Sequence, residues 1–141
     1  MEQAARRGLA TNVRFDGTLP AGEPVFDSLD AIDVYLHPSL AEGLPRAVIE
    51  AMSRGCPVVA SNVGGTPELL PAEVLHDPGD VDRLSDLLRL ATDHGFRVAA
   101  ARRNFDTARE YSREKLLARR DEFWGAFAEA ARQQKSISAK A

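Results

Sequence analysis

Two glutamates eight residues apart, Glu42 and Glu50, are the first candidates for chemistry in this chain. They flank the start of a predicted helix, Pro45–Arg54, and Gly43 lies in the loop before it. The free N–H groups and the positive dipole end at a helix start attract anions, and a glycine lets a phosphate approach the backbone closely. The carboxylates would repel that phosphate unless they accept hydrogen bonds from sugar hydroxyls. This combination suits a nucleotide-sugar, which carries a hydroxyl-rich group on each side of a diphosphate.

A second glycine site follows the predicted strand that ends at Ser61. The pair Gly64-Gly65 permits a tight turn near a ligand, and Thr66-Pro67 is typical of a helix start, with Thr66 as the N-cap. In a parallel sheet this loop would emerge at the same edge as the loop that contains Glu42. Glu68, just after it, is as well suited to a cap or a salt bridge as to a substrate contact.

Structural roles compete with these functional ones. Glu42 suits the helix dipole without any ligand, Glu50 suits a solvated helix surface, and spacing alone does not decide between the alternatives. Arg46 is expected to be exposed rather than bound to phosphate, and His37 to be a structural hydrogen-bonding group rather than a catalyst. Cys56 is expected to be a small buried side chain, because no reactive pair is near it in the sequence.

The elements that must position these residues follow an α/β order. Two short apolar runs separated by a helix favour a parallel sheet covered on both faces, with right-handed crossovers. Short helices are expected at Glu2–Arg7, ended by Gly8, and at Pro24–Leu29. The predicted strands are Val13–Phe15, Val34–His37, Val58–Ser61 and Val74–His76.

The last third of the chain is predicted to be helical. Asp80–Thr92 would place Val81, Leu84, Leu87 and Leu88 on one face, and a second helix would run from after His94-Gly95 to about Glu110. Ser112 resembles the N-cap of a third helix that carries Phe123, Trp124 and Phe127, which we expect to pack on the sheet or on a partner domain. The predicted organisation is therefore residues 1–110 as a nucleotide-sugar-binding domain, 111–133 as a terminal helix and 134–141 as a disordered tail.

Composition narrows the class of protein. The 141 residues suit one compact domain, and 44% are apolar, enough for a buried core. A formal net charge of −3 gives no reason to expect a nucleic-acid partner. The single cysteine excludes an internal disulfide, and no Cys/His cluster has zinc-site spacing. We expect a cytoplasmic protein without a cofactor or a bound metal, and we leave peripheral contact with a membrane open.

Three motifs in order identify a family resemblance. They are Pro38-Ser39-x-x-Glu42-Gly43-Leu44-Pro45-x-x-x-x-Glu50-Ala51-Met52, Gly55-x-Pro57-Val58-Val59-Ala60, and Gly64-Gly65-x-Pro67-Glu68. Together they resemble the group 1 glycosyltransferases, family 4 of the retaining enzymes, from about Val13 to Leu90. The resemblance implies the GT-B architecture, in which two Rossmann-like domains face each other across a cleft. The carboxyl-terminal one binds the nucleotide-sugar, and transfer proceeds with retained anomeric configuration and without a catalytic metal.

The same resemblance implies roles for individual residues. Glu42 and Glu50 occupy the two glutamate positions of the family's E-x7-E motif, so Glu42 would contact the donor sugar as the catalytic residue and Glu50 would bind the ribose hydroxyls. The amides of Gly43 and Leu44 would lie beside the diphosphate. The other donor-binding residues that it implies are Ser39, Pro45, Gly64 and Gly65.

The chain departs from the family pattern at its amino end. The family's donor domain starts earlier, with a strand, a glycine-rich loop and a basic pair that grips the diphosphate, and no residue here matches that pair. A fragment, a truncated gene product and one member of a split enzyme all fit this departure, and activity is expected only together with the missing amino-terminal part. The expected partners besides the nucleotide-sugar are an amino-terminal acceptor domain or a second copy of the chain. The alternatives are a non-catalytic nucleotide-sugar-binding or partner-binding module, and a nucleotide-sugar epimerase of the same architecture, against which the Glu42–Pro45 loop argues.

Overall fold

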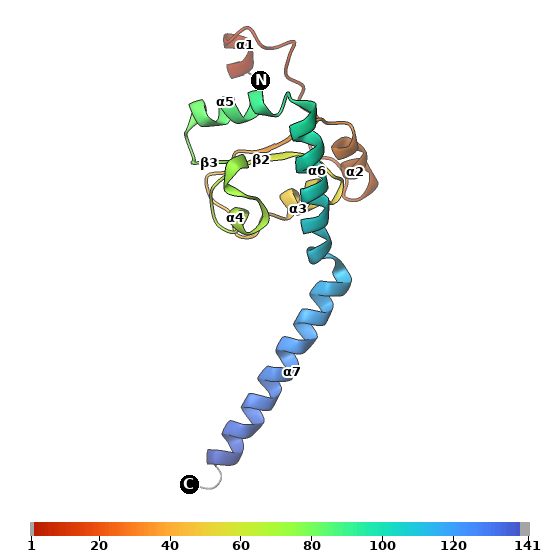
Figure 1. Cartoon of the computed structure of the whole chain (residues 1–141), viewed down its shortest axis with the longest axis vertical. Coiled ribbons are helices and arrows are strands. Elements are labelled where there is room, and N and C mark those ends of the chain that lie inside the picture. The colour runs from red at the N-terminus through yellow and green to blue at the C-terminus, as the bar shows by residue number, and fades with distance from the viewer. Residues whose placement is uncertain (1, 139–141) are drawn as a thin grey trace.

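A computed structural model describes residues 2–138, and its centre is a small parallel sheet (Figure 1). The strands are β1 (Tyr35–His37), β2 (Val58–Ser61) and β3 (Leu75–His76), in the order β1-β2-β3. Both neighbouring pairs are parallel, with Leu36 opposite Val59 and Ser61 opposite His76. The α/β fold with a parallel sheet is therefore confirmed, together with three of the four predicted strands.

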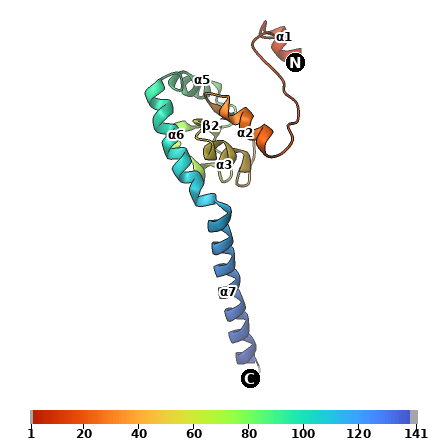
Figure 2. The ribbon, with the colours of Figure 1, turned by 90° about the vertical axis from the view of Figure 1, so that its right-hand side faces the viewer.

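The fourth predicted strand, Val13–Phe15, is wrong. The segment has no strand structure, and Val13 and Phe15 are 41% and 58% exposed. With helix α1 (Glu2–Arg6) it lies away from the sheet (Figures 1 and 2). A strand needs a neighbour for its backbone hydrogen bonds, and here Arg14 instead closes a local ion pair with Asp16, Nε to Oδ1 at 2.6 Å.

Helices connect and flank the strands. The chain passes through α2 (Glu23–Asp30) into β1, through α3 (Arg46–Ser53) into β2, and through α4 (Thr66–Leu69) and the 3-10 turn η1 (Ala72–Val74) into β3. The predicted crossover helix is confirmed as α3, which starts after Pro45 and ends before Gly55, a residue whose φ of 73° suits glycine. The core forms where α3 covers the sheet, with Val48 and Met52 fully buried against a β2 strand that is buried throughout.

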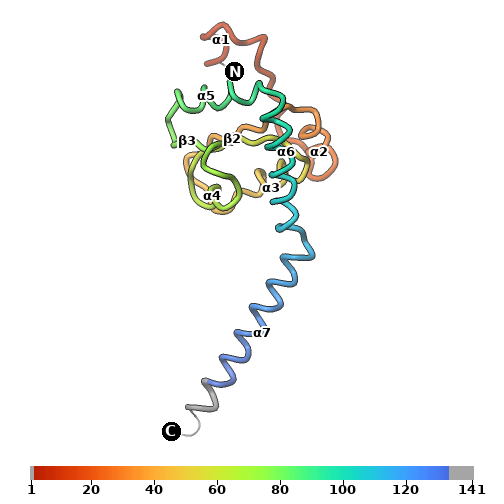
Figure 3. Tube along the Cα trace, in the orientation of Figure 1, coloured from red at the N-terminus to blue at the C-terminus, as the bar shows by residue number. Residues whose placement is uncertain are grey.

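Two helices follow the sheet, each with an aspartate cap. Asp80 caps α5 (Val81–Leu90) and Asp93 caps α6 (His94–Ala108), each accepting a bond from a backbone amide in the first turn. Helix α6 packs along α3 (Figure 3). The predicted apolar face of α5 is only partly correct, because Leu87 is buried while Val81, the first residue of the helix, is 67% exposed.

The terminal helix α7 (Arg113–Ser138) follows the 3-10 turn η2 (Arg109–Tyr111) and projects away from the body (Figures 1 and 2). Ser112 caps it as predicted, accepting from the Lys115 amide at 3.4 Å. The expected packing of its aromatic side chains on the sheet is wrong, because Phe123, Trp124 and Phe127 are 61%, 56% and 58% exposed and contact one another instead. Packing on a partner domain, the other expectation, stays a prediction.

The backbone of α7 also passes the predicted boundary at residue 133 and stays helical to Ser138. Residues 133–138 contain no proline or glycine, which would end a helix. The rest of the predicted tail, residues 139–141, lies outside the described residues.

Candidate functional site

Three polar side chains meet at the carboxyl end of β1. The Ser39 hydroxyl donates a hydrogen bond to Glu42 Oε1 at 2.6 Å, and His37 Nε2 lies 2.7 Å from the same oxygen. Ser39 Oγ and His37 Nε2 are 3.2 Å apart, so the three groups form a closed triangle. Both bonds to the carboxylate end on Oε1, and within the described residues no donor reaches Oε2. One oxygen of Glu42 is thus held in place while the other is left for a ligand.

The hydrogen bonds of this triangle also indicate which nitrogen of His37 carries a proton and keep Glu42 ionised. An ionised carboxylate only accepts hydrogen bonds, so the proton of His37 lies on Nε2. Hydrogen bonds from Ser39 and then from His37 lower the pKa of Glu42 below its ordinary value. The His37 and Glu42 side chains are 16% and 23% exposed. The result is an ionised, oriented carboxylate at the sheet edge, and His37 takes the hydrogen-bonding role expected of it.

We expect Ser39→Ala to raise the pKa of Glu42, because it removes the largest stabilising contact of the ionised form. The folded protein then binds a proton on Glu42 more tightly, so this carboxylate becomes neutral at a higher pH than in the wild type. A carbon-detected NMR titration of the Glu42 carboxyl measures the change directly. Ser53→Ala is the matched control, since the Ser53 hydroxyl bonds the Glu50 carbonyl instead. An unchanged Glu42 titration in Ser39→Ala would contradict this account of the site.

The second glycine site lies directly on the Glu42 loop. The Gly65 amide donates to the Gly43 carbonyl at 2.7 Å, which joins the two loops. Gly64 has a φ of 52°, and a Cβ built there would lie 2.0 Å from the Glu42 carbonyl oxygen. A Cβ on Gly65 would lie 2.9 Å from the Gly43 oxygen. The prediction that both glycine sites share one edge of the sheet is confirmed, and their role in the described chain is close packing of two backbones.

Gly43 differs from that pair. Its φ lies outside the left-handed region, and a Cβ built on it would meet nothing within 4 Å. Neither the backbone conformation nor the packing of the described chain requires a glycine at this position. The space beside it is therefore open to a ligand that approaches the backbone.

The start of α3 next to Gly43 is uncapped. Its N-cap is Pro45, which makes no side-chain cap bond. The first amides of a helix have no acceptor within the helix, so those of Arg46 and Ala47 are free for an outside acceptor. An anion at this point also gains from the positive end of the helix dipole.

Glu50 lies two turns along α3 and faces a different space from Glu42. It is half-buried and lines a cavity of about 580 Å³ between the start of α3 and the junction of η2 with α7. Leu44, from the predicted site, lines the same cavity, together with Arg46 and Tyr111. Burial, and after it the negative charges of Glu50 and Glu42, raises the pKa of Tyr35 on β1, so both carboxylates act on one region of the sheet.

The structure therefore sorts the predicted site residues into two adjoining groups. The first group surrounds the sheet edge and comprises Ser39, Glu42, Gly43, Pro45, Gly64 and Gly65. The second surrounds the cavity and comprises Leu44 and Glu50.

Sequence reasoning missed part of the cavity wall. Arg113, Leu116, Leu117 and Arg120 of α7 line it, opposite α3. Counted from Arg113, they follow at three, four and seven residues, so they lie on one face of the helix. This spacing is visible in the sequence and could have identified them as one group. Nothing in the sequence, however, indicated that this face lies beside Glu50.

The described part of the chain has neither a cluster of metal ligands nor a membrane-spanning helix. It contains no group of three or more His, Cys, Asp or Glu side chains arranged to hold a metal ion. No helix within residues 2–138 is both long enough and apolar enough to cross a membrane.

The parallel sheet and its helices resemble the carboxyl-terminal domains of GT-B glycosyltransferases. Sucrose-phosphate synthase from Thermosynechococcus elongatus superimposes with a TM-score of 0.81 at 24% identity, over 92% of this chain and 33% of that one. The HepE protein of Anabaena in complex with UDP superimposes with a TM-score of 0.75 at 27% identity, over 91% of this chain and 35% of that one. The fold is thus that of the carboxyl-terminal domain of a GT-B glycosyltransferase.

The sequence comparison specifies the family. The family described as glycosyl transferases group 1 matches residues 1–93. An O-antigen chain mannosyltransferase B of Escherichia coli is 34% identical over 116 residues, which are 81% of this chain and 29% of that protein. The chain belongs to the group 1 glycosyl transferases. The matched residues cover 29% of that mannosyltransferase and 22% of another relative, the Protein CapJ of Staphylococcus aureus, so the chain spans only part of the length of these relatives.

Proposed function

We propose that this chain is the donor-binding part of a retaining glycosyltransferase, which binds a nucleotide-sugar and transfers its sugar to an acceptor. One observation carries the proposal: the oriented Glu42 carboxylate lies beside the uncapped start of α3. A carboxylate suits sugar hydroxyls and a free helix start suits a diphosphate. A nucleotide-sugar presents both groups next to each other.

Each part of the donor has a proposed place. The diphosphate lies against the backbone at Gly43 and Leu44, and Gly43 has no Cβ to block its approach. The free Oε2 of Glu42 accepts a hydrogen bond from the sugar, and Glu50 accepts from the ribose hydroxyls. The two carboxylates then contact opposite ends of one ligand, which agrees with their facing different spaces.

In the proposed reaction the protein stabilises the departing diphosphate and orients the sugar, through a loose, oxocarbenium-like transition state without a catalytic metal. The nucleotide part of the proposal is supported by HepE, which is in complex with UDP. The acceptor is expected to bind outside this chain, since the matched residues cover less than a third of either of two relatives. We propose that transfer requires that additional part.

We expect Glu50→Ala to weaken binding of a nucleoside, a nucleoside diphosphate and a nucleotide-sugar alike, because all three contain the ribose. A hydrogen bond to a charged group contributes about 1.5–3 kcal/mol, so a roughly ten- to hundredfold rise in Kd is expected. Calorimetry or NMR titration with uridine, UDP and UDP-glucose, and with the guanosine series, measures it. Glu122→Ala is the matched control, because Glu122 is exposed on α7 away from the cavity.

The result also tests the division of roles. If Glu42→Ala and Glu50→Ala lose nucleoside diphosphate affinity equally, the two glutamates do not contact different ends of the donor. If the wild-type chain binds no member of either nucleotide series, the donor-binding proposal is wrong.

A further inference from the structure

The cavity beside Glu50 is electropositive within an acidic chain. Three arginines line it, Arg46, Arg113 and Arg120, and Glu50 is the single acidic residue among the lining residues. The formal charge of the lining is thus 3 − 1 = +2, while the whole chain carries −3. Charges of one sign gathered in a concave site with apolar walls attract a ligand of the opposite sign.

The arginines converge from two elements. Arg46 is the first residue of α3, and Arg113 and Arg120 lie two turns apart on the same face of α7. Leu116 and Leu117 lie between the two α7 arginines and form an apolar wall. A ligand in the cavity would therefore have cations on both sides of it and an apolar surface along one of them.

Most of these arginines have no ion-pair partner among the described side chains. Among the described side chains, Arg46 and Arg113 form no ion pair, and Arg120 pairs only with its exposed neighbour Asp121 at 3.2 Å. Glu110, the other acid near the start of α7, does not neutralise them, because it pairs with Lys115 and Arg119. The excess of positive charge around the cavity therefore favours binding of an anion there.

The ligand that fits is a phosphate-bearing one. The planar guanidinium donates two parallel hydrogen bonds and so matches phosphate oxygens. Leu44 and Glu50 line the same cavity, so it adjoins both the Gly43 backbone and the proposed ribose position. A volume of about 580 Å³ is within the range of small-molecule sites.

We propose that Arg46, Arg113 and Arg120 form a phosphate-binding subsite, through which the start of the terminal helix α7 holds the diphosphate of the donor. This assignment rests on the proposed nucleotide-sugar function and extends it to residues of α7.

The test uses inorganic diphosphate, which contains no ribose and no base. In a ¹H–¹⁵N NMR titration of the full 141-residue chain, diphosphate shifts the side-chain Nε–H signals of Arg46, Arg113 and Arg120. The double variant Arg113→Gln/Arg120→Gln loses roughly tenfold or more in diphosphate affinity, the size expected for lost charged hydrogen bonds. Both arginines are exposed and glutamine is a good helix former, so the variant keeps its fold, which circular dichroism checks.

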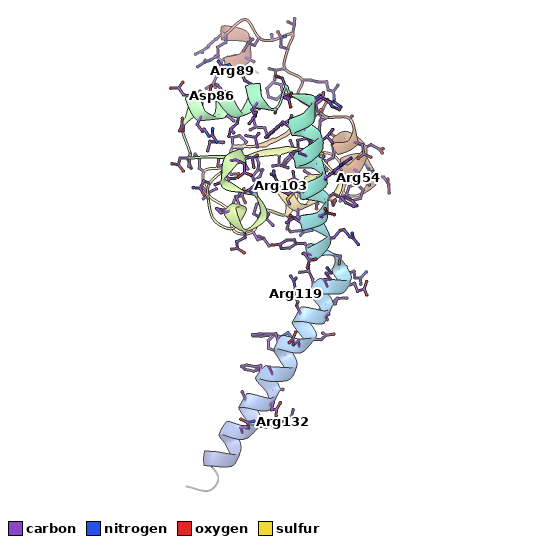
Figure 4. The ribbon with its side chains drawn as sticks, in the orientation of Figure 1. Arg54, Asp86, Arg89, Arg103, Arg119 and Arg132 are labelled. Carbon is purple, nitrogen blue, oxygen red and sulfur yellow. The ribbon has the colours of Figure 1, made fainter. Side chains whose placement is uncertain are left out.

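Arg132→Gln is the matched control. It makes the same substitution on the same helix, but Arg132 lies far along α7 from the body, beyond Arg119 (Figure 4). It leaves diphosphate affinity unchanged. Equal affinities in the double variant and the control, or no shift of the three arginine signals with millimolar diphosphate, would overturn the proposal.

Binding of uridine, which contains a ribose but no phosphate, distinguishes the arginine subsite from the proposed ribose contact of Glu50. The double variant binds uridine as the wild type does, because the lost groups contact only phosphate, whereas Glu50→Ala loses uridine and keeps diphosphate. Loss of diphosphate binding in the arginine variant together with normal uridine binding in Glu50→Ala supports the subsite and contradicts the ribose role of Glu50. A Glu50-dependent uridine site with diphosphate affinity unchanged in the double variant rejects the subsite and leaves the donor proposal standing.

Discussion

Gly64→Ala is expected to lower the free energy of unfolding by roughly 3 kcal/mol or more, since left-handed backbone costs a non-glycine residue about 1–2 kcal/mol and overpacking typically costs about 1–3 kcal/mol. The φ of 52° causes the first cost, and the Cβ position 2.0 Å from the Glu42 carbonyl oxygen causes the second. Because the clash is with backbone, no side-chain rotation relieves it. Urea unfolding followed by circular dichroism gives the free energy change.

The three site glycines form a graded series. Gly65→Ala should be destabilising by less, because its Cβ would lie 2.9 Å from the Gly43 oxygen at an ordinary φ. Gly43→Ala should be close to neutral in stability, since it meets nothing within 4 Å, yet it should weaken nucleoside diphosphate binding if phosphate approaches that backbone. Equal stability of the Gly43 and Gly64 variants would show that the two loops are not packed as described.

The second large effect is expected on turnover. In an enzyme that combines this chain with its acceptor-binding part, Glu42→Ala should reduce turnover and nucleotide-sugar affinity roughly ten- to hundredfold, the range for one charged hydrogen bond. It should leave nucleoside diphosphate affinity nearly unchanged, because Glu42 is proposed to contact the sugar alone. Steady-state kinetics together with calorimetry on UDP and UDP-glucose separate the two effects.

Two further variants sharpen that experiment. Ser39→Ala keeps the carboxylate but removes the shorter of the two bonds that orient it, so turnover should fall less than in Glu42→Ala. Glu122→Ala, on the exposed surface of α7, should behave as the wild type. Full turnover in Glu42→Ala would show that the oriented carboxylate does not act on the sugar.

The sequence by itself determined the elements that depend on near neighbours. Pro45 and Gly55 bracket α3, and the apolar run at Val58 becomes the buried strand β2. These signals are local: proline suits a helix start, glycine suits the left-handed residue after its end, and a continuous apolar run is stable only when buried. The alternation of strand and helix then places Glu42 and Gly64 at one edge of the sheet, as the structure confirms.

Only the tertiary structure decided the features that depend on distant partners. Val13–Phe15 has the composition of a strand, but a strand exists only when a neighbour satisfies its backbone, and none lies beside it in the described residues. The exposed aromatic side chains of α7 show the same dependence, because an apolar helix face does not specify what covers it. The arginines of α7 line one cavity with Glu50 of α3 only because η2 joins α6 to α7 beside α3. Spacing reveals which residues share a face, whereas the packing of separate elements determines which faces meet.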